Sequence, residues 1–257
     1  ASPLTLAVTY TKAESGVVVA ATATSGDTLT AGTSAPFTAI AGPAARLAVT
    51  SPNGATSVTA AAAFPVVVQS QDANGNPSNP SQATSVALTV ATGSGTLGGT
   101  LTGTILTSAS SVTLSAATYT KAESGVSVKA TATSGSVLTV GTSAAFTVNV
   151  GVATQVVVTS VNGGVSPIAG TPFDIVVGVQ DAGGNATTVV ADTVVALARG
   201  AGSATLGGVT NGTILARTNS VTISGATYLK AEPGVTVVAT ATSGDTLTAG
   251  TSAGMTV

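Results

Sequence analysis

Cysteine, histidine and tryptophan are all absent from this 257-residue sequence, and only 6% of its residues carry a formal charge. An average soluble domain is about one quarter charged. Without Cys or His the chain has no thiol chemistry, no zinc-finger spacing and no Ser-His-Asp or Cys-His catalytic arrangement. The few Lys and Asp residues are scattered, so we expect a protein that is not an enzyme.

The scarcity of charge also bears on partners. Seven Lys or Arg residues and a net charge of −2 provide no basic patch that could neutralise a run of phosphates, so we expect no nucleic-acid partner.

Mean hydropathy is positive, at +0.54, which raises the question of a membrane span. The most apolar stretch, residues 58–68, is nevertheless broken by Thr59 and Pro65 and is shorter than the roughly 20 residues that span a bilayer. We expect no membrane span, and any secretory signal would have been removed or would lie outside this sequence.

A long internal repeat is present. The segment TYTKAESGVVVAATATSGDTLTAGTSAPFT begins at Thr9, and close copies begin at Thr118 and Thr227, which gives a period of 109 residues. The other part of the unit recurs once at the same offset, in the pairs Phe64 and Phe173, Asp72 and Asp181, Asn76 and Asn185, Leu97 and Leu206, and Ile105 and Ile214. This period is the size of an independently folding domain. We predict the C-terminal part of a preceding repeat at 1–40 and complete repeats at 41–149 and 150–257.

Short apolar alternations separated by Gly, Pro, Asn and Ser clusters predict about seven strands in each complete unit. The alternating residues of the first unit are Leu47 and Val49; Phe64, Val66 and Val68; Val86, Leu88 and Val90; Val112 and Leu114; Val126, Val128 and Ala130; Phe146 and Val148. Helical spacing does not extend over any useful length. The sequence therefore predicts an all-β protein of tandem immunoglobulin-like β-sandwich domains. Tyr10, Tyr119 and Tyr228 are interpreted as corner tyrosines, with the ring in the core and the hydroxyl on a backbone partner.

Several motifs occur in the same order in both complete units. VVVQSQDANGNP begins at Val66, IVVGVQDAGGN begins at Ile175, and GTLGGT, ATYTKAESGVSVKATA and GTSAAFTV follow in the first unit. These segments resemble tandem immunoglobulin-like repeats of large secreted or cell-surface bacterial proteins, in the style of invasin and intimin modules. The resemblance covers nearly the whole chain. It implies an extracellular or cell-surface stalk, adhesin or envelope fibre.

The best candidate for a site is the Asp-x-x-x-Asn turn. Asp72, Asn74 and Asn76 have the spacing of calcium-loop oxygen ligands, and Asp181 and Asn185 repeat part of it. Ala83 stands where an EF-type loop needs a carboxylate. The alternative, which we prefer, is an Asx turn in which the Asp oxygens accept backbone N–H bonds. We expect no catalytic residue and no cofactor, with calcium kept as the one open alternative.

Two further patterns are weaker. Asn185-Ala-Thr and Asn211-Gly-Thr match N-glycosylation sequons, which arise by chance in a chain this rich in Thr. A Lys-x-Glu pair recurs in all three copies and predicts an exposed ion pair worth no more than about 1 kcal/mol. These pairs are Lys12 and Glu14, Lys121 and Glu123, and Lys230 and Glu232.

The expected partners follow from the uncharged surface. Exposed sheet edges are normally guarded by Lys or Pro, and this chain has few such guards, so we expect coverage by copies of itself or neighbouring repeats in a fibre, or by glycans. The linkers at residues 40–45 and 149–154 are short, which favours a semi-rigid rod. The leading function is a structural segment of a surface fibre or stalk. The alternative is an adhesin module that binds glycan or protein through its loops.

Overall fold

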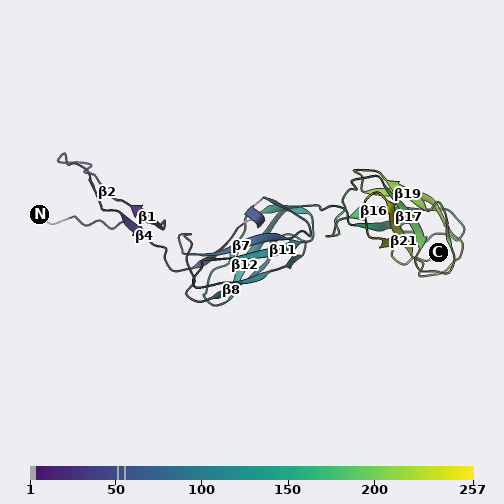
Figure 1. Ribbon diagram of the computed structural model, residues 1–257, viewed down its shortest axis with the longest axis horizontal. Coiled ribbons are helices and arrows are strands. Elements are labelled where there is room, and N and C mark those ends of the chain that lie inside the picture. The colour runs from purple at the N-terminus through teal and green to yellow at the C-terminus, as the bar shows by residue number, and fades with distance from the viewer. Residues whose placement is uncertain (1–3, 51, 55) are drawn as a thin grey trace.

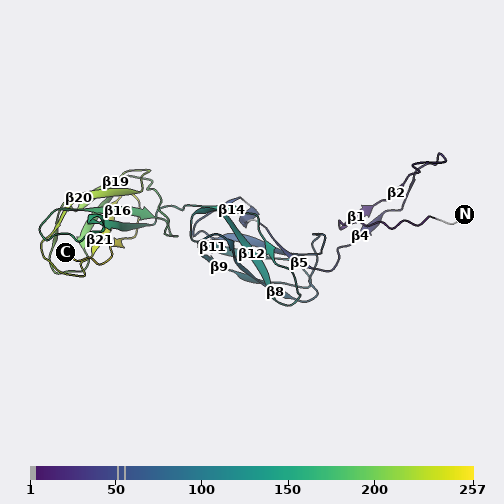
Figure 2. The same ribbon diagram turned by 180° about the vertical axis from the view of Figure 1, so that it is seen from behind.

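The structure is a computed structural model that describes residues 4–50, 52–54 and 56–257. Strands, turns and loops make up nearly all of these residues, and the two helical segments among them are short 3-10 turns, η1 (Pro52–Gly54) and η2 (Asn162–Gly164). The all-β fold predicted from the alternating sequence is confirmed. The strands form successive units along the chain, as two opposite views show (Figure 1 and Figure 2).

The first complete unit is a sandwich of two sheets. One sheet contains, in spatial order, β5 (Arg46–Val49), β7 (Phe64–Gln71), β11 (Ser111–Tyr119) and β9 (Leu97–Gly99). The other contains β10 (Thr102–Ile105), β8 (Thr84–Thr92), β12 (Glu123–Ser134), β14 (Phe146–Asn149) and β6 (Ser57–Thr59), with β13 (Gly141–Thr142) also paired to β12. β14 and β6 run parallel, and the other strand pairs of this unit are antiparallel. This two-layer arrangement is that of an immunoglobulin-like sandwich.

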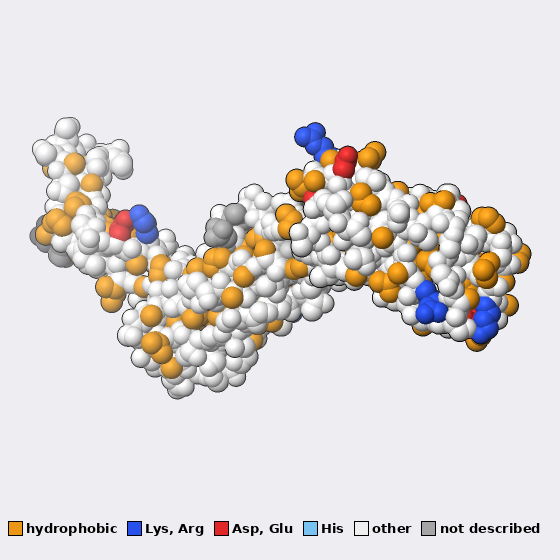
Figure 3. Space-filling view, turned by 45° about the vertical axis from the view of Figure 1, so that its right-hand side comes forward, with side chains coloured by type: hydrophobic (Ala, Val, Ile, Leu, Met, Phe, Trp, Pro, Cys, Tyr) orange, Lys and Arg blue, Asp and Glu red, His pale blue; other side chains and the backbone are white. Residues whose placement is uncertain are grey.

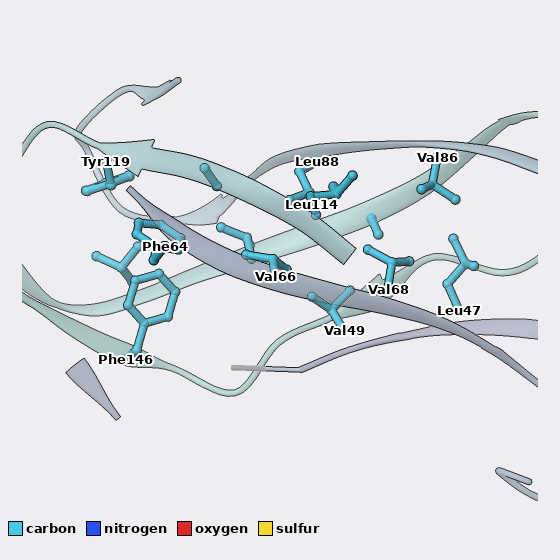
Figure 4. Close-up of a cluster of buried hydrophobic side chains, with 14 of the residues drawn as sticks. Leu47, Val49, Phe64, Val66, Val68, Val86, Leu88, Leu114, Tyr119 and Phe146 are labelled. Carbon is cyan, nitrogen blue, oxygen red and sulfur yellow. The ribbon is translucent and has the colours of Figure 1, made fainter. Parts of the chain in front are cut away.

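The core between the two sheets follows from the alternation of the sequence. Successive residues of β7 alternate between buried and half-buried, because neighbouring side chains on a strand point to opposite faces. The rings of Phe64 and Phe146 meet edge to face with their centroids 6.2 Å apart, a favourable aromatic geometry. Most of the predicted inward-facing residues are buried (Figure 4). Val90 and Val112 are half-buried and pack against this core.

The second complete unit repeats the architecture around a separate core. Its sheets are β15 (Gln155–Val161), β16 (Phe173–Gln180), β20 (Ser220–Tyr228) and β18 (Leu206–Gly208), opposed by β19 (Asn211–Ile214), β17 (Thr193–Arg199), β21 (Val237–Ser243) and β22 (Gly250–Thr251). One difference lies beside residues 255–257, which correspond to β14 but form only an isolated bridge, between Val235 and Met255. Pro167 stands at the position of Val58, and residues 166–168 form no strand that corresponds to β6. Proline has no N–H to donate to a ladder, which explains the loss of this pairing.

The N-terminal segment contains two small antiparallel pairs. β1 (Glu14–Val17) pairs with β4 (Phe37–Ala39), and β2 (Ala20–Ala21) pairs with β3 (Gly32–Thr33). Its side chains are far more exposed than their equivalents in the complete units. Tyr10 is 50% exposed where Tyr119 is fully buried, and Phe37 is 42% exposed where Phe146 is only 2% exposed. Within residues 4–40, no second sheet covers these apolar side chains.

A candidate docking joint between consecutive repeats

The Asp-x-x-x-Asn turn directly follows β7. The Asp72 carboxylate is almost fully buried and accepts four hydrogen bonds of 2.9 Å. The backbone N–H groups of Asn74 and Asn76 donate to Oδ1, while the Gly42 N–H and the Asn76 side-chain amide donate to Oδ2. Gly75 takes a φ of +93°, in the left-handed region that glycine adopts readily. The Asp72 carboxylate thus shapes the turn and ties it to the linker that precedes the repeat.

The Asn76 side chain connects this turn to the preceding repeat. Its Nδ2 donates to the backbone oxygen of Thr11 at 2.8 Å, and its Oδ1 accepts from the backbone N–H of Ala13 at 2.9 Å. One amide thereby pairs with a carbonyl and an N–H that lie two residues apart, as a neighbouring strand would. The contact needs both a donor and an acceptor on one planar group, which Asn supplies and Asp does not.

The same joint recurs one period later. Asn185 donates from Nδ2 to the Thr120 oxygen at 2.8 Å and accepts from the Ala122 N–H at 2.8 Å. Asp181 holds Asn185 through the backbone N–H at 2.9 Å and the side-chain amide at 3.0 and 3.1 Å. All of these positions match those of the first joint at the 109-residue spacing. Two consecutive boundaries between repeats therefore use one set of hydrogen bonds.

The backbone N–H and the backbone oxygen of each linker glycine both form hydrogen bonds to the following repeat. The Gly42 oxygen accepts from Ser78 Oγ at 2.6 Å, and its N–H donates to Asp72. In the second joint the Gly151 N–H donates to Asp181 Oδ2 at 2.8 Å, and its oxygen accepts from Thr187 Oγ1 at 2.8 Å. Because both polar groups of each linker glycine are engaged by the following repeat, the linker is held as part of that repeat rather than left as a free tether.

A tyrosine corner supports the other side of the second joint. The buried Tyr119 hydroxyl donates to Glu123 Oε1 at 2.5 Å and accepts from the Gly95 N–H at 2.7 Å. Glu123 also accepts from the N–H and Oγ of Ser94, at 2.7 and 2.8 Å. The backbone between Tyr119 and Glu123, which Asn185 contacts, is therefore anchored at both ends. At Tyr119 the expected backbone partner of the hydroxyl is present, and the glutamate adds a second anchor that sequence reasoning missed. At Tyr10 the prediction is wrong, because the ring is 50% exposed and the hydroxyl donates to the Glu14 side chain.

The Lys-x-Glu pairs lie at the same corners. The Nζ to Oε2 distances are 2.6, 3.4 and 2.9 Å for the pairs at Lys12, Lys121 and Lys230. Each lysine side chain is more than half exposed, so these ion pairs are screened by solvent and contribute little to stability. The glutamates matter more through their hydrogen bonds to the corner than through their lysine partners.

The carboxylates of the joint and corner are held in the ionised form. The side-chain hydrogen bond from Asn76, with help from backbone N–H donors, lowers the pKa of Asp72 to about 2. Burial opposes ionisation of Asp181, but its hydrogen bonds from Gly151 and Asn185 outweigh this and lower its pKa. The hydrogen bond from Tyr119 lowers the pKa of Glu123 to about 2. Hydrogen bonds to the charged form favour that form.

The candidate calcium residues divide into distinct roles. Asp72 and Asn76 come together in one joint and Asp181 and Asn185 in the other, whereas Asn74 contributes only its backbone N–H to Asp72. Residues 4–50, 52–54 and 56–257 contain no group of three or more His, Cys, Asp or Glu side chains arranged to hold a metal. The same residues include no helix long and apolar enough to span a membrane. The preferred prediction stays the hydrogen-bonded turn, with calcium binding as its untested alternative.

Sequence reasoning missed the partners of the turn, Thr11–Ala13 and Thr120–Ala122. The sequence did hold a sign of this contact, because the turn and the TYTKAE segment repeat with the same 109-residue period.

The two N-glycosylation sequons differ in their structural surroundings. The Asn185 side chain belongs to the joint, and its Nδ2 is already a donor to Thr120 and Asp181, whereas Asn211 lies exposed in β19.

A surface depression lies elsewhere, in the second complete unit. It has a volume of about 460 Å³ and lies between residues 158–161, 163–166 and 252–256. In the first unit β6 occupies the corresponding edge of β14. Its lining contains Val, Thr, Ser, Gly, Ala and Met and no charged side chain. The depression therefore lies where the second unit has no strand at the positions of β6 and β14, and its lining offers no acid, base or nucleophile–base pair.

No protein-family model and no curated protein matches the chain. Solved structures with a similar fold include the FdeC adhesin of Escherichia coli, at 15% identity and a TM-score of 0.34 over 86% of this chain and 67% of that one. Others are the BSP domain of a biofilm-associated protein (17%, TM-score 0.27, 81% and 29%) and the FN1–FN3 domains of chicken CNTN1 (12%, TM-score 0.25, 93% and 75%). The chain spans about a quarter of the length of a similar β-glycosidase from Bacteroides vulgatus, at 12% identity and a TM-score of 0.32 over 82% of this chain. Similarities at this level concern the fold alone.

Proposed function

We propose that this chain is a non-catalytic structural segment of an extracellular bacterial fibre or stalk, built from tandem immunoglobulin-like repeats of the invasin and intimin style. The observation that carries the proposal is the repeated joint. Asn76 and Asn185 each bond two backbone groups of the repeat before them, with matching partners and distances. A contact copied at every boundary suits a spacer, because each added repeat extends the array by the same step.

The linkers support the same proposal. Gly42 and Gly151 each use both backbone polar groups in bonds to the following repeat. A flexible Gly/Ser tether would leave such groups to water and let neighbouring domains reorient. Linkers held by hydrogen bonds reduce the reorientation of neighbouring domains, so the array stays extended and its two ends stay apart. A stalk requires this property, whereas a chain of freely hinged modules lacks it.

The surface is consistent with burial among neighbours or under glycans. Charged side chains are sparse on the face shown in Figure 3, where apolar side chains are scattered among backbone and uncharged side chains. Exposed apolar residues include Val137 at 97% and Ile168 at 73%. A surface with so little charge resists association poorly. We therefore include lateral contacts between copies of the chain, or attached glycans, in the proposal.

Two measurements test the function. Immunogold electron microscopy with antibodies to this chain should label filaments or stalks on cells that express it, and label confined to the cell interior would overturn the proposal. Small-angle X-ray scattering should give the pair-distance distribution of a stiff rod. An Asn76→Ala/Asn185→Ala double variant should broaden that distribution. Saturable binding of the chain to one glycan or host protein would instead favour the adhesin function.

A further inference from the structure

The chain carries a third copy of the corner that the joints use. The Tyr228 hydroxyl is buried, donates to Glu232 and accepts from the Ala204 N–H at 2.9 Å. Glu232 accepts from the N–H and Oγ of Ser203 at 2.6 and 2.7 Å. These bonds match those of Tyr119, Glu123 and Ser94 one period earlier. The backbone from Leu229 to Ala231 is therefore anchored at both ends, like the backbone that Asn185 contacts.

The two backbone groups at the centre of this third corner have no partner among the residues that the structure describes. They are the Leu229 oxygen and the Ala231 N–H, the counterparts of the Thr120 oxygen and the Ala122 N–H. In both other copies this pair of groups binds one asparagine side chain. The third corner thus presents an anchored acceptor and donor two residues apart in the chain, as the corners of both joints do.

We propose that the Leu229 oxygen and the Ala231 N–H form a docking site for the Asp-x-x-x-Asn loop of a further repeat joined head to tail. The proposal rests on the proposed function, since it takes the joint to be the general contact of the array. The occupant is specified by the two joints in this chain. It must present an asparagine amide held by a neighbouring buried carboxylate, as Asn185 is held by Asp181.

The sequence differences at this corner leave the contact atoms intact. Thr120 is replaced by Leu229, and Ser124 by Pro233. The first change affects only a side chain, because the joint uses the main-chain oxygen of this position. The Leu229 side chain is 73% exposed, so a docked repeat would also remove apolar surface from water. Pro233 lacks an N–H, but its position donates to the incoming amide in neither existing joint.

The test uses the full chain and a version extended by one repeat. Val257 corresponds to Val148, so a copy of residues 149–257 placed after Val257 continues the period. Amide hydrogen exchange should show Ala231 exchanging roughly 30-fold more slowly in the extended chain than in the original, because the same two hydrogen bonds would form. In the appended repeat, replacing the asparagine that corresponds to Asn185 with alanine should abolish this protection. Alanine at the appended counterpart of the exposed Asn219 should leave it unchanged.

The internal joint serves as a reference in the same samples. Protected Ala122 together with an Ala231 that exchanges equally fast in both chains would overturn this inference and leave the proposed function standing. Rapid exchange at both amides would instead contradict the joint on which the proposed function rests. Protection of Ala231 that survives the appended alanine would show that something other than the asparagine covers it, which also overturns the inference.

Discussion

Replacing Asn185 with alanine tests the joint directly. The substitution removes the bond from Nδ2 to the Thr120 oxygen and the bond from the Ala122 N–H to Oδ1, both 2.8 Å long. A neutral hydrogen bond contributes about 1 kcal/mol net, so the two together should couple the repeats by about 2 kcal/mol. The variant also takes one side-chain donor from Asp181, which is buried. The second complete repeat should therefore lose stability together with its contact to the first.

The Ala122 amide is the reporter. Its N–H donates to the Asn185 side chain, so exchange with solvent requires the joint to open. A coupling of about 2 kcal/mol corresponds to roughly 30-fold protection, which the variant should lose. Asn219→Ala is the matched control, because that side chain is exposed and its recorded bond is with the adjacent Ser220. Unchanged Ala122 exchange in Asn185→Ala would refute the assignment of the joint.

Aspartate at the same position sharpens the test. Asn185→Asp keeps an oxygen for the Ala122 N–H but replaces the donor that faces Thr120 and Asp181. Two carboxylates in contact repel, so this variant should lose more stability than alanine at pH 7. It should recover part of that loss near pH 4, where one carboxylate takes up a proton. Equal effects of alanine and aspartate at both pH values would contradict the assigned donor and acceptor roles.

Three further predictions concern the corner, the acid response and calcium. Tyr119→Phe should lower the free energy of unfolding in urea by about 1–2 kcal/mol, because it removes the hydroxyl's bonds to Glu123 and to the Gly95 N–H, which keeps its 3.1 Å bond to Glu123 Oε1. Tyr10→Phe, at a half-exposed site, should have little effect. The folded-state pKa of Asp72, about 2, lies below the roughly 3.9 of an unfolded Asp, so its contribution to stability should be present above pH 4 and lost as the pH falls towards 2. Urea unfolding across that range should show this loss. Asp72→Asn should remove the share of Asp72 and leave the shares of Asp181 and Glu123, whose pKa values are also lowered. The Asp72 oxygens already accept four N–H bonds, so calcium and chelator should give equal melting temperatures, and a rise with calcium would restore the metal-loop interpretation.

The sequence by itself determined the fold class and the positions of most core residues. Period-two alternation places Val66 and Val68 on one face of a strand, and burying that face against a second sheet satisfies the pattern. The recurring tyrosine, in an otherwise nearly aromatic-free chain, marked the corner that the structure shows at Tyr119. The spacing of Asp72 and Asn76 marked a polar turn. In each case side-chain chemistry repeats at a fixed interval, and an interval can be read from one sequence.

Only the tertiary structure decided what the polar turn contacts. Asn76 meets Thr11 and Ala13, 65 and 63 residues earlier, because the path of the chain through the sandwich brings this turn back to the preceding corner. The atoms that it meets are a main-chain oxygen and a main-chain N–H. Nearly every residue has both groups, so no residue type could mark them. The fold alone selects which of them are anchored, unpaired within their own repeat, and within 3 Å of an asparagine amide.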